Sequence, residues 1–233
     1  AKYGRPFRDY IANTGLILAQ AQKEGKNILF EAQLGALKDI DYGICPYTSS
    51  STPLAAYAPI GSGAPFLKVD KVMGIAKAYS TAVGEGPFIS EWEGEQAEKL
   101  RRAGSEYGAA TGRPRRVGPI DLVATSYGVK LQGADCICLT KLDVLSYLDE
   151  IPLCVAYRKG DGETRDFPYT SELDACEPVY ETMPGWKCDI SGARTYSELP
   201  KEARDYVERI EREIGCPISY VSVGAQRDAL IRR

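Results

Sequence analysis

A loop rich in glycine and arginine, Gly104–Gly118, is the strongest chemical signal in the sequence. Its four glycines allow backbone N–H groups to approach a ligand closely. Arg113, Arg115 and Arg116 add permanently charged guanidinium groups, which can bind phosphate or carboxylate through two hydrogen bonds. Pro119 then opens a predicted helix, whose N-terminus also favours anions. The segment therefore predicts an anion-binding site, with a solvated basic turn as the alternative.

Two further segments place polar residues directly after apolar runs. Lys141–Asp143 follow the run 135–140, and Ser222–Gly224 end the run 218–223. If these runs are strands of an open α/β sheet, ligands are expected at their C-terminal ends. A carboxylate there can accept hydrogen bonds from N1–H and N2–H of guanine, whereas adenine offers no matching pair of donors. Each segment also has an ordinary alternative: surface residues at the first, and a glycine-terminated strand at the second.

The residue types and motifs that the sequence lacks limit the possible chemistry as strongly as those that it contains. The chain has no histidine, the commonest general acid or base near neutral pH. It also lacks the GxxxxGK[ST], HExxH and GxSxG motifs, and no GxGxxG follows a strand. Catalysis would have to rest on carboxylates, lysine, tyrosine or cysteine, or on another polypeptide segment. We therefore expect an element that recognises a base without the element that cradles a triphosphate.

Composition indicates an ordinary globular protein of the reducing cytoplasm. The 233 residues carry a net charge of −3 with a pI near 5.3, so we expect neither nucleic acid nor a membrane as partner. No apolar run approaches the ~18–20 residues of a membrane span, and we expect no signal peptide. The seven cysteines include no CxxC pair, so we expect small buried residues rather than a zinc site or disulfide framework. They are Cys45, Cys136, Cys138, Cys154, Cys176, Cys188 and Cys216.

The elements that must position these residues follow from apolar periodicity. Helices are predicted over residues 7–24, 68–79, 94–103, 119–131 and 200–214. Strands are predicted over residues 27–30, 80–90, 135–140, 152–157 and 218–223. Residues 33–65 are rich in Gly, Pro, Ser and Thr and are predicted to form a long loop, which is usually functional or disordered. Short apolar strands that alternate with helices predict an α/β fold with a partly parallel central sheet flanked by helices.

Taken in chain order, several stretches resemble the adenylosuccinate synthetase family. They are FEAQLGALKDIDYG, KAYSTAVGEGPF, EYGAATGRPRRVGPID, LTKLDVLSYLDEIPLCVAYR, CEPVYETMPGW and RDYVERIEREIGCPISYVSVG. The resemblance implies the C-terminal part of a fold similar to P-loop GTPases. It also implies a homodimeric, Mg²⁺-dependent ligase that uses GTP to join IMP and L-aspartate in purine biosynthesis. Phosphate would pass from GTP to the purine oxygen, and the aspartate amine would then displace it.

The resemblance also implies roles for individual residues. The aspartate-binding loop would consist of Ala109, Ala110, Thr111, Gly112, Arg113, Pro114 and Arg115. The GTP site would consist of Arg115, Lys141, Leu142, Asp143, Ser222, Val223 and Gly224, with Lys141 to Asp143 reading guanine. The IMP site would include Gln33, Thr48 and Arg113.

Some positions depart from the family pattern. The family has an EGAQG segment where this chain has Glu31-Ala-Gln-Leu-Gly35, so a gapless alignment places Leu34 rather than Gln33 at the glutamine. A similar shift in the alignment leaves either Thr48 or Ser49 at the position of the family's IMP-contacting threonine. Ala110 stands where a threonine is common, which removes one hydroxyl from the aspartate loop, and Pro114 stands where an arginine is common.

The family's phosphate loop, with its base Asp and metal site, and its catalytic His open the family's chain and are not found here. We therefore expect a C-terminal fragment of a larger synthetase domain, inactive alone, with no catalytic residue or metal ligand of its own. Residues 1–103 would form the acceptor-nucleotide side, and residues 104–233 the aspartate-loop and guanine-binding side. Two alternatives stay open: a non-catalytic purine- or guanine-nucleotide-binding module, and a related synthetase that acts on a 2-aminopurine deoxynucleotide.

Overall fold

The computed structural model describes residues 3–233 of the chain. The α-helices are α1 (Thr14–Lys23), α2 (Ala58–Gly61), α3 (Gly94–Gly104), α4 (Leu122–Gln132), α5 (Thr170–Leu173) and α6 (Lys201–Ile214). The strands are β1 (Met73–Lys77), β2 (Ser80–Ala82), β3 (Arg116–Gly118), β4 (Ile120–Asp121), β5 (Cys136–Thr140), β6 (Glu150–Lys159), β7 (Gly162–Thr164), β8 (Glu177–Pro184), β9 (Ile218–Ser222) and β10 (Leu230–Arg232). Six short 3₁₀ helices join them: η1 (Arg5–Tyr10), η2 (Ala36–Lys38), η3 (Ala55–Tyr57), η4 (Leu142–Tyr147), η5 (Tyr196–Glu198) and η6 (Arg227–Ala229).

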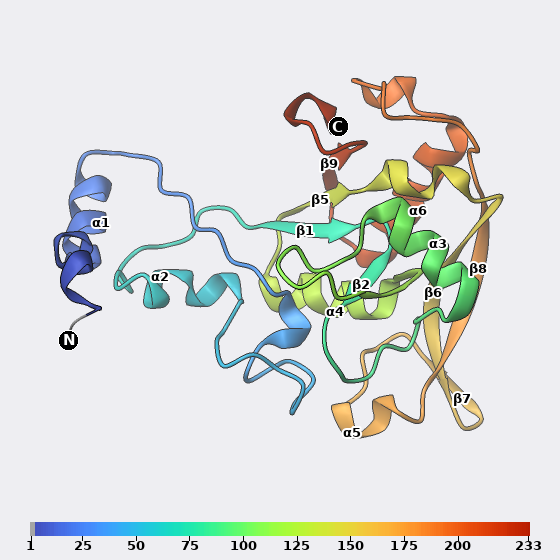
Figure 1. Ribbon diagram of the computed structural model, residues 1–233, viewed down its shortest axis with the longest axis horizontal. Helices are drawn as coiled ribbons and strands as arrows, with labels where there is room; N and C mark the ends of the chain where they lie inside the picture. Colours follow the sequence, from blue (N-terminus) through green and yellow to red (C-terminus); the bar gives the residue numbers. More distant parts are fainter. Residues whose placement is uncertain (1–2) are drawn as a thin grey trace.

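The strands form mixed sheets, and the central one has the order β1-β5-β9-β10. In it β1, β5 and β9 run parallel, and only β10 is antiparallel. A second sheet pairs β6 with β4 in parallel and with β7 and β8 in antiparallel fashion, and β2 pairs with β3. Helices flank these sheets (Figure 1), so the expected α/β fold with a partly parallel sheet is confirmed.

Helix α6 shows why the main core forms where it does. Its buried positions recur at helical spacing, so one face of the helix is apolar and packs inward. These positions are Ala203, Tyr206, Val207, Ile210 and Ile214. The buried hydroxyl of Tyr206 donates a hydrogen bond of 2.7 Å to the carbonyl of Ala78, which ties α6 to the turn after β1. Residues from β5, β6, β9 and α3 complete the same cluster, and this shared core fixes the strand ends described below.

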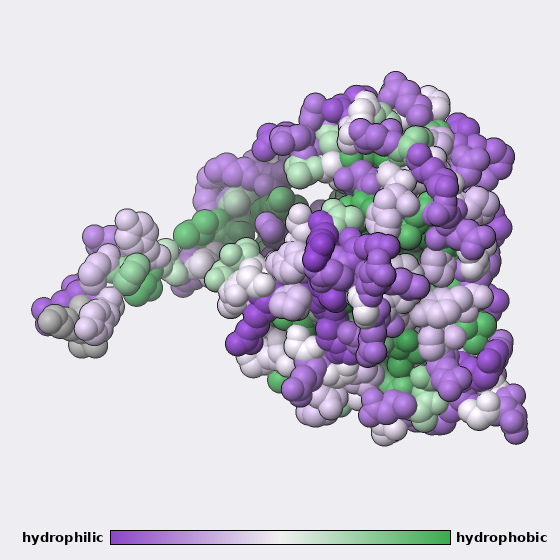
Figure 2. Space-filling view, turned by 45° about the vertical axis from the view of Figure 1, so that its right-hand side comes forward, coloured by the Kyte–Doolittle hydropathy of each residue, from purple (hydrophilic) through white to green (hydrophobic). Residues whose placement is uncertain are grey.

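The N-terminal segment differs from this body. Helix α1 has no buried residue, although its sequence is apolar in part. Among its exposed side chains and those before it are Phe7, Ile11, Leu16 and Ile17. The segment extends away from the sheets in Figure 1, and Figure 2 shows it as a thin projection with a hydrophobic portion. The body alone therefore provides the packed scaffold.

Several expected elements are wrong. The predicted helix 68–79 contains strand β1 instead, because residues 73–77 pair along their length with residues 136–140 of β5. The predicted helix 7–24 is broken at Asn13, whose side chain accepts a hydrogen bond from Leu16 N–H and caps the start of α1. Residues 27–30 form no strand. The helix expected to open at Pro119 begins at Leu122, after the short strand β4.

The cysteines are all unpaired in the structure. Four of them are buried, as expected for small apolar side chains, but the expectation is wrong for Cys45 and Cys188, which are exposed because they lie in turns outside the sheets. Across residues 3–233, no helix has both the length and the apolar character needed to cross a membrane.

Candidate functional site

Polar residues from distant parts of the chain meet where the parallel strands end. In the register of the central sheet, Lys77 at the end of β1 lies opposite Thr140 at the end of β5, and Leu139 lies opposite Val221 of β9. Lys141–Asp143 and Ser222–Gly224 therefore leave the sheet at the same edge. This edge is where ligands bind in open α/β sheets. The structure thus brings together two segments that the sequence places 81 residues apart, counted from Lys141 to Ser222.

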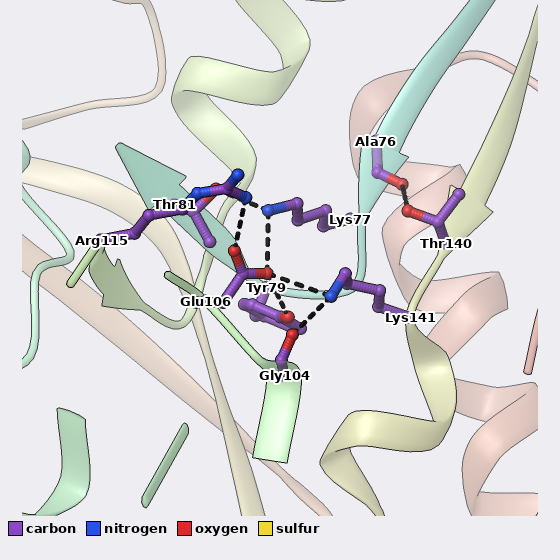
Figure 3. Close-up of polar contacts among 9 residues, drawn as sticks. All are labelled: Ala76, Lys77, Tyr79, Thr81, Gly104, Glu106, Arg115, Thr140 and Lys141. Atoms are coloured by element: carbon purple, nitrogen blue, oxygen red, sulfur yellow. Dashed lines mark hydrogen bonds and ion pairs between the residues drawn. The ribbon is translucent and has the colours of Figure 1, made fainter. Parts of the chain in front are cut away.

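A fully buried carboxylate, that of Glu106, lies at the centre of this edge (Figure 3). Its Oε1 accepts hydrogen bonds from the Tyr79 hydroxyl at 2.6 Å and from Lys77 Nζ at 2.9 Å. Its Oε2 accepts a hydrogen bond of 2.8 Å from the Arg115 guanidinium. Lys141 Nζ lies 3.4 Å from Oε1 and donates a hydrogen bond of 2.6 Å to the carbonyl of Gly104. One carboxylate therefore faces three cations.

These surroundings decide the charge of the cluster. Burial alone raises the pKa of Glu106, but hydrogen bonds from Tyr79 and Lys77 and the charges of Lys77 and Lys141 outweigh it and bring that pKa down to about 2. Burial also lowers the pKa of Lys77, an effect that Glu106 opposes. Burial, together with the hydrogen bond to Glu106, raises the pKa of Tyr79. The carboxylate is thus ionised near neutral pH, and the surplus of cations leaves the edge positively charged.

Two buried polar atoms at this edge have no partner among residues 3–233. They are Nε of Arg115 and Oδ1 of Asp143. Burial raises the pKa of Asp143, because its charge is poorly solvated there. A buried donor or acceptor without a partner costs free energy, about 1–3 kcal/mol, so native structures rarely leave one without a reason. The two atoms therefore offer a donor and an acceptor to a ligand.

The backbone places Asp143 through an unusual turn. Lys141, the residue directly after β5, has a φ of 61°, a left-handed conformation that only a few per cent of non-glycine residues adopt. This turn starts η4, in which Leu142 is buried and anchors the segment. On the neighbouring strand, the Ser222 hydroxyl donates to the carbonyl of Gly224 at 2.9 Å, and Val223 is buried. The Ser222–Gly224 segment is therefore fixed by its own contacts.

The expected aspartate loop is an exposed turn. Residues Ala109–Pro114 are exposed. The turn is closed at its base by hydrogen bonds between Gly108 N–H and the carbonyl of Arg113, and between Gly112 N–H and the carbonyl of Gly108, both 2.8 Å long. Gly112 has a φ of 65°, which explains a glycine at this position. Within the described residues, the Arg113 guanidinium makes no hydrogen bond or ion pair, so it is available for an anion.

Two parts of the predicted anion site are wrong. The Arg116 guanidinium donates to both carboxylate oxygens of Glu91 and to the carbonyl of Gly86, at 2.7 Å for the latter. Arg116 therefore holds a neighbouring turn rather than a ligand. The N-terminus of α4 is also occupied, because the buried carboxylate of Asp121 caps it by accepting the Ala124 N–H at 2.9 Å. The usable arginines are Arg113 and Arg115.

The expected acceptor-side residues lie in the long loop, away from the strand ends in sequence. Gln33 is exposed, as is Leu34, its competitor in the alignment, and Leu34 has a φ of 82°. Thr48 is half-buried, and its hydroxyl has no partner within residues 3–233, whereas the Ser49 hydroxyl bonds Ser51. The loop packs near the turn held by Arg116, since the Tyr47 ring lies against Gly86.

Sequence reasoning missed Glu106, Lys77 and Tyr79. Glu106 lies inside the arginine-glycine loop, but nothing local distinguishes it from a surface carboxylate. Lys77 could have been found as a lysine that ends an apolar strand, in the same way as Lys141, if residues 73–77 had been predicted as a strand. The error in one element therefore hid one residue of the site.

Comparison with known proteins gives a consistent result. The sequence model described as adenylosuccinate synthetase matches residues 1–231. The adenylosuccinate synthetase of Heliobacterium modesticaldum is 46% identical over 230 residues, which are 98% of this chain and 54% of that protein. That of Bifidobacterium adolescentis is 48% identical over 233 residues, 99% of this chain and 54% of that protein. The chain therefore spans about half the length of the curated relatives it matches.

Solved structures agree with the fold. The fully ligated adenylosuccinate synthetase of Plasmodium falciparum superposes with a TM-score of 0.94 at 36% identity, covering 100% of this chain and 56% of that one. The succinoaminodeoxyadenylate synthetase of cyanophage S-2L, bound to dGMP and dATP, gives a TM-score of 0.58 at 16% identity, over 99% of this chain and 55% of that one. At that identity the second likeness concerns the fold alone.

Proposed function

The chain belongs to the adenylosuccinate synthetase family, and from this premise we propose that residues 1–233 form the substrate-binding part of such a synthetase. The complete enzyme would use GTP to join IMP and L-aspartate into adenylosuccinate, a step of purine biosynthesis. Residues 104–233 would bind guanine nucleotide and aspartate, and residues 1–103 would bind the acceptor nucleotide. The groups that transfer phosphate would come from outside residues 1–233, since the relatives extend well beyond the matched segment.

One observation carries the guanine assignment: the buried Oδ1 of Asp143 has no partner within the described residues. Guanine presents N1–H and N2–H side by side, and an ionised carboxylate can accept both. A ligand with these donors would give the orphaned oxygen its partner and would favour the ionised form of Asp143. Adenine has no such pair, so the same oxygen would stay unsatisfied. Asp143 would thus select guanine.

The neighbouring residues would complete the nucleotide site. The stem of Lys141 and the buried Leu142 would cover the base, and Ser222, Val223 and Gly224 would flank it from the next strand. Arg115 keeps a buried Nε–H donor free of protein partners in the described chain, which suits a nucleotide oxygen. The excess of cations around Glu106 would attract the negative charge of GTP.

The exposed turn would hold L-aspartate. Its residues Ala109, Ala110, Thr111, Gly112 and Pro114 are exposed, and Arg113 presents a guanidinium without a protein partner among residues 3–233. A guanidinium can bind a carboxylate through two hydrogen bonds, which is what a dicarboxylate substrate requires. Arg113 would also contact the IMP phosphate or ribose, together with Gln33 and Thr48 of the long loop.

The family implies Mg²⁺, but residues 3–233 contain no group of three or more His, Cys, Asp or Glu side chains arranged to hold a metal ion. We propose that any Mg²⁺ ligands lie outside residues 1–233.

Nucleotide competition tests the proposal directly. The affinities of GTP, ITP and ATP are measured on the full-length protein that contains these residues. ITP keeps N1–H but lacks the 2-amino group, so we expect it to bind roughly 5- to 150-fold more weakly than GTP, because one acceptor stays unsatisfied. ATP, which lacks both donors, should bind most weakly. Equal affinities for the three nucleotides would contradict the guanine assignment.

A homodimer is the proposed assembly of the full-length protein. Apolar side chains on and around α1, including Leu16 and Ile17, are exposed, which supports the proposal that a second protein surface covers them. Light scattering on the purified full-length protein should give twice the chain mass, and a monomer at micromolar concentration would contradict this part of the proposal.

A further inference from the structure

We propose that Glu106 is a positioning residue that holds Arg115 and Lys141 in the arrangement which the guanine nucleotide requires. This inference rests on the proposed function, because it concerns the same site. Glu106 itself is fully buried and cannot reach a ligand, so it would act only through the cations around it. It deepens the proposed function by naming the residue that organises the nucleotide side.

The connection between Glu106 and Arg115 is made twice. The Arg115 backbone N–H donates to the carbonyl of Glu106 at 2.9 Å, and the guanidinium donates to Oε2 at 2.8 Å. Between them, Tyr107 and Pro114 form an antiparallel bridge that closes the exposed turn. The base of the aspartate loop is therefore fixed by Glu106 at both the backbone and the side chain.

The two carboxylate oxygens of Glu106 contact different partners. Oε2 bonds Arg115, while Oε1 accepts from Tyr79 and Lys77 and lies 3.4 Å from Lys141 Nζ. With its other end engaged by Oε2, the Arg115 guanidinium keeps Nε buried and without a partner in the described chain. The carboxylate thus fixes the orientation of the guanidinium and leaves one of its donors for a ligand.

Charge argues against a purely structural ion pair. One cation would neutralise Glu106, yet Lys77, Arg115 and Lys141 all face it. They come from the end of β1, the end of the aspartate loop and the residue after β5, and this one carboxylate contacts all three. Without it, three cations would repel one another at close range, and each could move apart. Glu106 therefore keeps together cations that a nucleotide needs together.

Glu98 on α3 offers a matched control. Its carboxylate also accepts hydrogen bonds from two arginines, Arg101 and Arg102, and from the Tyr107 hydroxyl. It lies near the surface, and neither arginine belongs to the proposed site. Replacing Glu98 removes a similar number of contacts without touching Arg115 or Lys141.

The experiment measures GTP affinity on the full-length protein for wild type, Glu106→Gln, Glu98→Gln, Arg115→Ala and the double variant Glu106→Gln with Arg115→Ala. Glutamine keeps the size of Glu106 but turns an NH₂ group toward the cations. We expect GTP to bind about 10-fold more weakly to Glu106→Gln and within about 2-fold of wild type to Glu98→Gln. In the double variant, Glu106→Gln should add about 3-fold or less to the loss from Arg115→Ala, because only its effect through Lys141 remains.

That non-additivity is the readout a structural role would not produce. If the losses from Glu106→Gln and Arg115→Ala multiply, or if Glu106→Gln binds GTP like wild type, the inference is wrong. If wild type binds no GTP, the proposed function fails instead. Should Glu106→Gln not fold, Tyr79→Phe removes one donor to Oε1 and keeps the carboxylate. It should weaken GTP binding about 3-fold, and by less once Arg115 is absent; an undiminished loss without Arg115 would overturn the inference.

Discussion

At the ends of β1 and β5 the buried carboxylate of Glu106 faces three cations, whereas at the start of α4 the buried carboxylate of Asp121 faces neutral donors. Asp121 accepts hydrogen bonds from Ala124 N–H at 2.9 Å and from the Tyr157 hydroxyl at 2.5 Å. Burial raises the pKa of Asp121 to about 6 despite these bonds, while the pKa of Glu106 falls to about 2.

The difference shows how surroundings assign a role to the same kind of group. Around Asp121 every carboxylate oxygen has a protein partner, so the region is closed and serves the fold by capping α4. Around Glu106 the cations outnumber the carboxylate, and two nearby polar atoms of Arg115 and Asp143 lack partners in the part of the chain that the structure describes. Burial alone therefore does not mark a site, but surplus charge with unsatisfied neighbours does.

The largest effect is expected for Arg115→Ala, which removes the cation proposed to lie between Glu106 and the nucleotide. Losing a charge-assisted contact costs about 1.5–3 kcal/mol, or roughly 10- to 150-fold in GTP affinity. Arg113→Ala should leave GTP affinity within about 2-fold and weaken IMP or aspartate instead. Titration of each ligand checks this, and equal losses of GTP in both variants would erase the distinction between the two arginines.

Arg113→Lys sharpens the same test. Lysine keeps the charge but cannot bind a carboxylate or phosphate through two parallel hydrogen bonds. Wild-type affinity for IMP and aspartate in this variant would show that the proposed geometry at Arg113 is unnecessary.

Asp143→Asn should reverse the choice of nucleotide. The asparagine amide turns an NH₂ donor toward a guanine donor, so GTP should bind more weakly by about 1–3 kcal/mol, roughly 5- to 150-fold. Xanthine has a carbonyl in place of the 2-amino group, so XTP should gain affinity. The KM values for both nucleotides in the full-length protein measure this. The matched variant Asp121→Asn should leave the ratio unchanged, and equal weakening of GTP and XTP by Asp143→Asn would mark Asp143 as structural.

A pH titration of stability tests the contrast between the two buried carboxylates. The pKa of folded Asp121, about 6, lies above its ordinary value of 3.8, so its protonated form stabilises the fold at low pH, and this contribution is lost as the pH rises through about 6. Asp121→Asn has no such loss. Its unfolding free energy should therefore rise relative to wild type by about 2 kcal/mol between pH 4 and pH 7.

The contribution of Glu106 to folding stability should depend on pH in the opposite sense. Its pKa is lowered from 4.5 to about 2, so its contribution is present above pH 4.5 and is lost as the pH falls toward 2. Denaturant unfolding of wild type, Asp121→Asn and Glu106→Gln over both pH ranges provides the data. A constant difference in unfolding free energy between wild type and Asp121→Asn from pH 4 to pH 7 would show that the pKa of Asp121 is not shifted.

The smallest effect is expected in the long loop. Gln33→Ala should weaken IMP by about 1 kcal/mol, roughly 5-fold, because it removes one neutral hydrogen bond from an exposed side chain. GTP affinity should not change. If Gln33→Ala binds IMP normally while Leu34→Gln improves it, the gapless alignment is correct and Leu34 occupies the glutamine position.

Sequence reasoning reached the fold class, helices α3, α4 and α6, and strands β5, β6 and β9. Helix α6 was predicted to end at 214 because its apolar residues recur at helical spacing and Gly215 can adopt the left-handed conformation at its end. The strand 135–140 followed from an unbroken apolar run. Strand β1 was missed because the spacing of apolar residues over 68–79 favours a helix, whereas pairing with β5 makes residues 73–77 a strand.

The candidate residues divide in the same way. The sequence by itself determined only which residues are candidates to bind guanine or anions, because Asp143, Lys141 and the arginines stand out by their chemistry and their place after an apolar run or among glycines. Tertiary structure alone decided that Arg116 pairs with Glu91, 25 residues away, and that Glu106 joins Lys77, 29 residues away, to Arg115. Burial, charge balance and unsatisfied atoms depend on segments meeting in space, and no local pattern encodes those meetings.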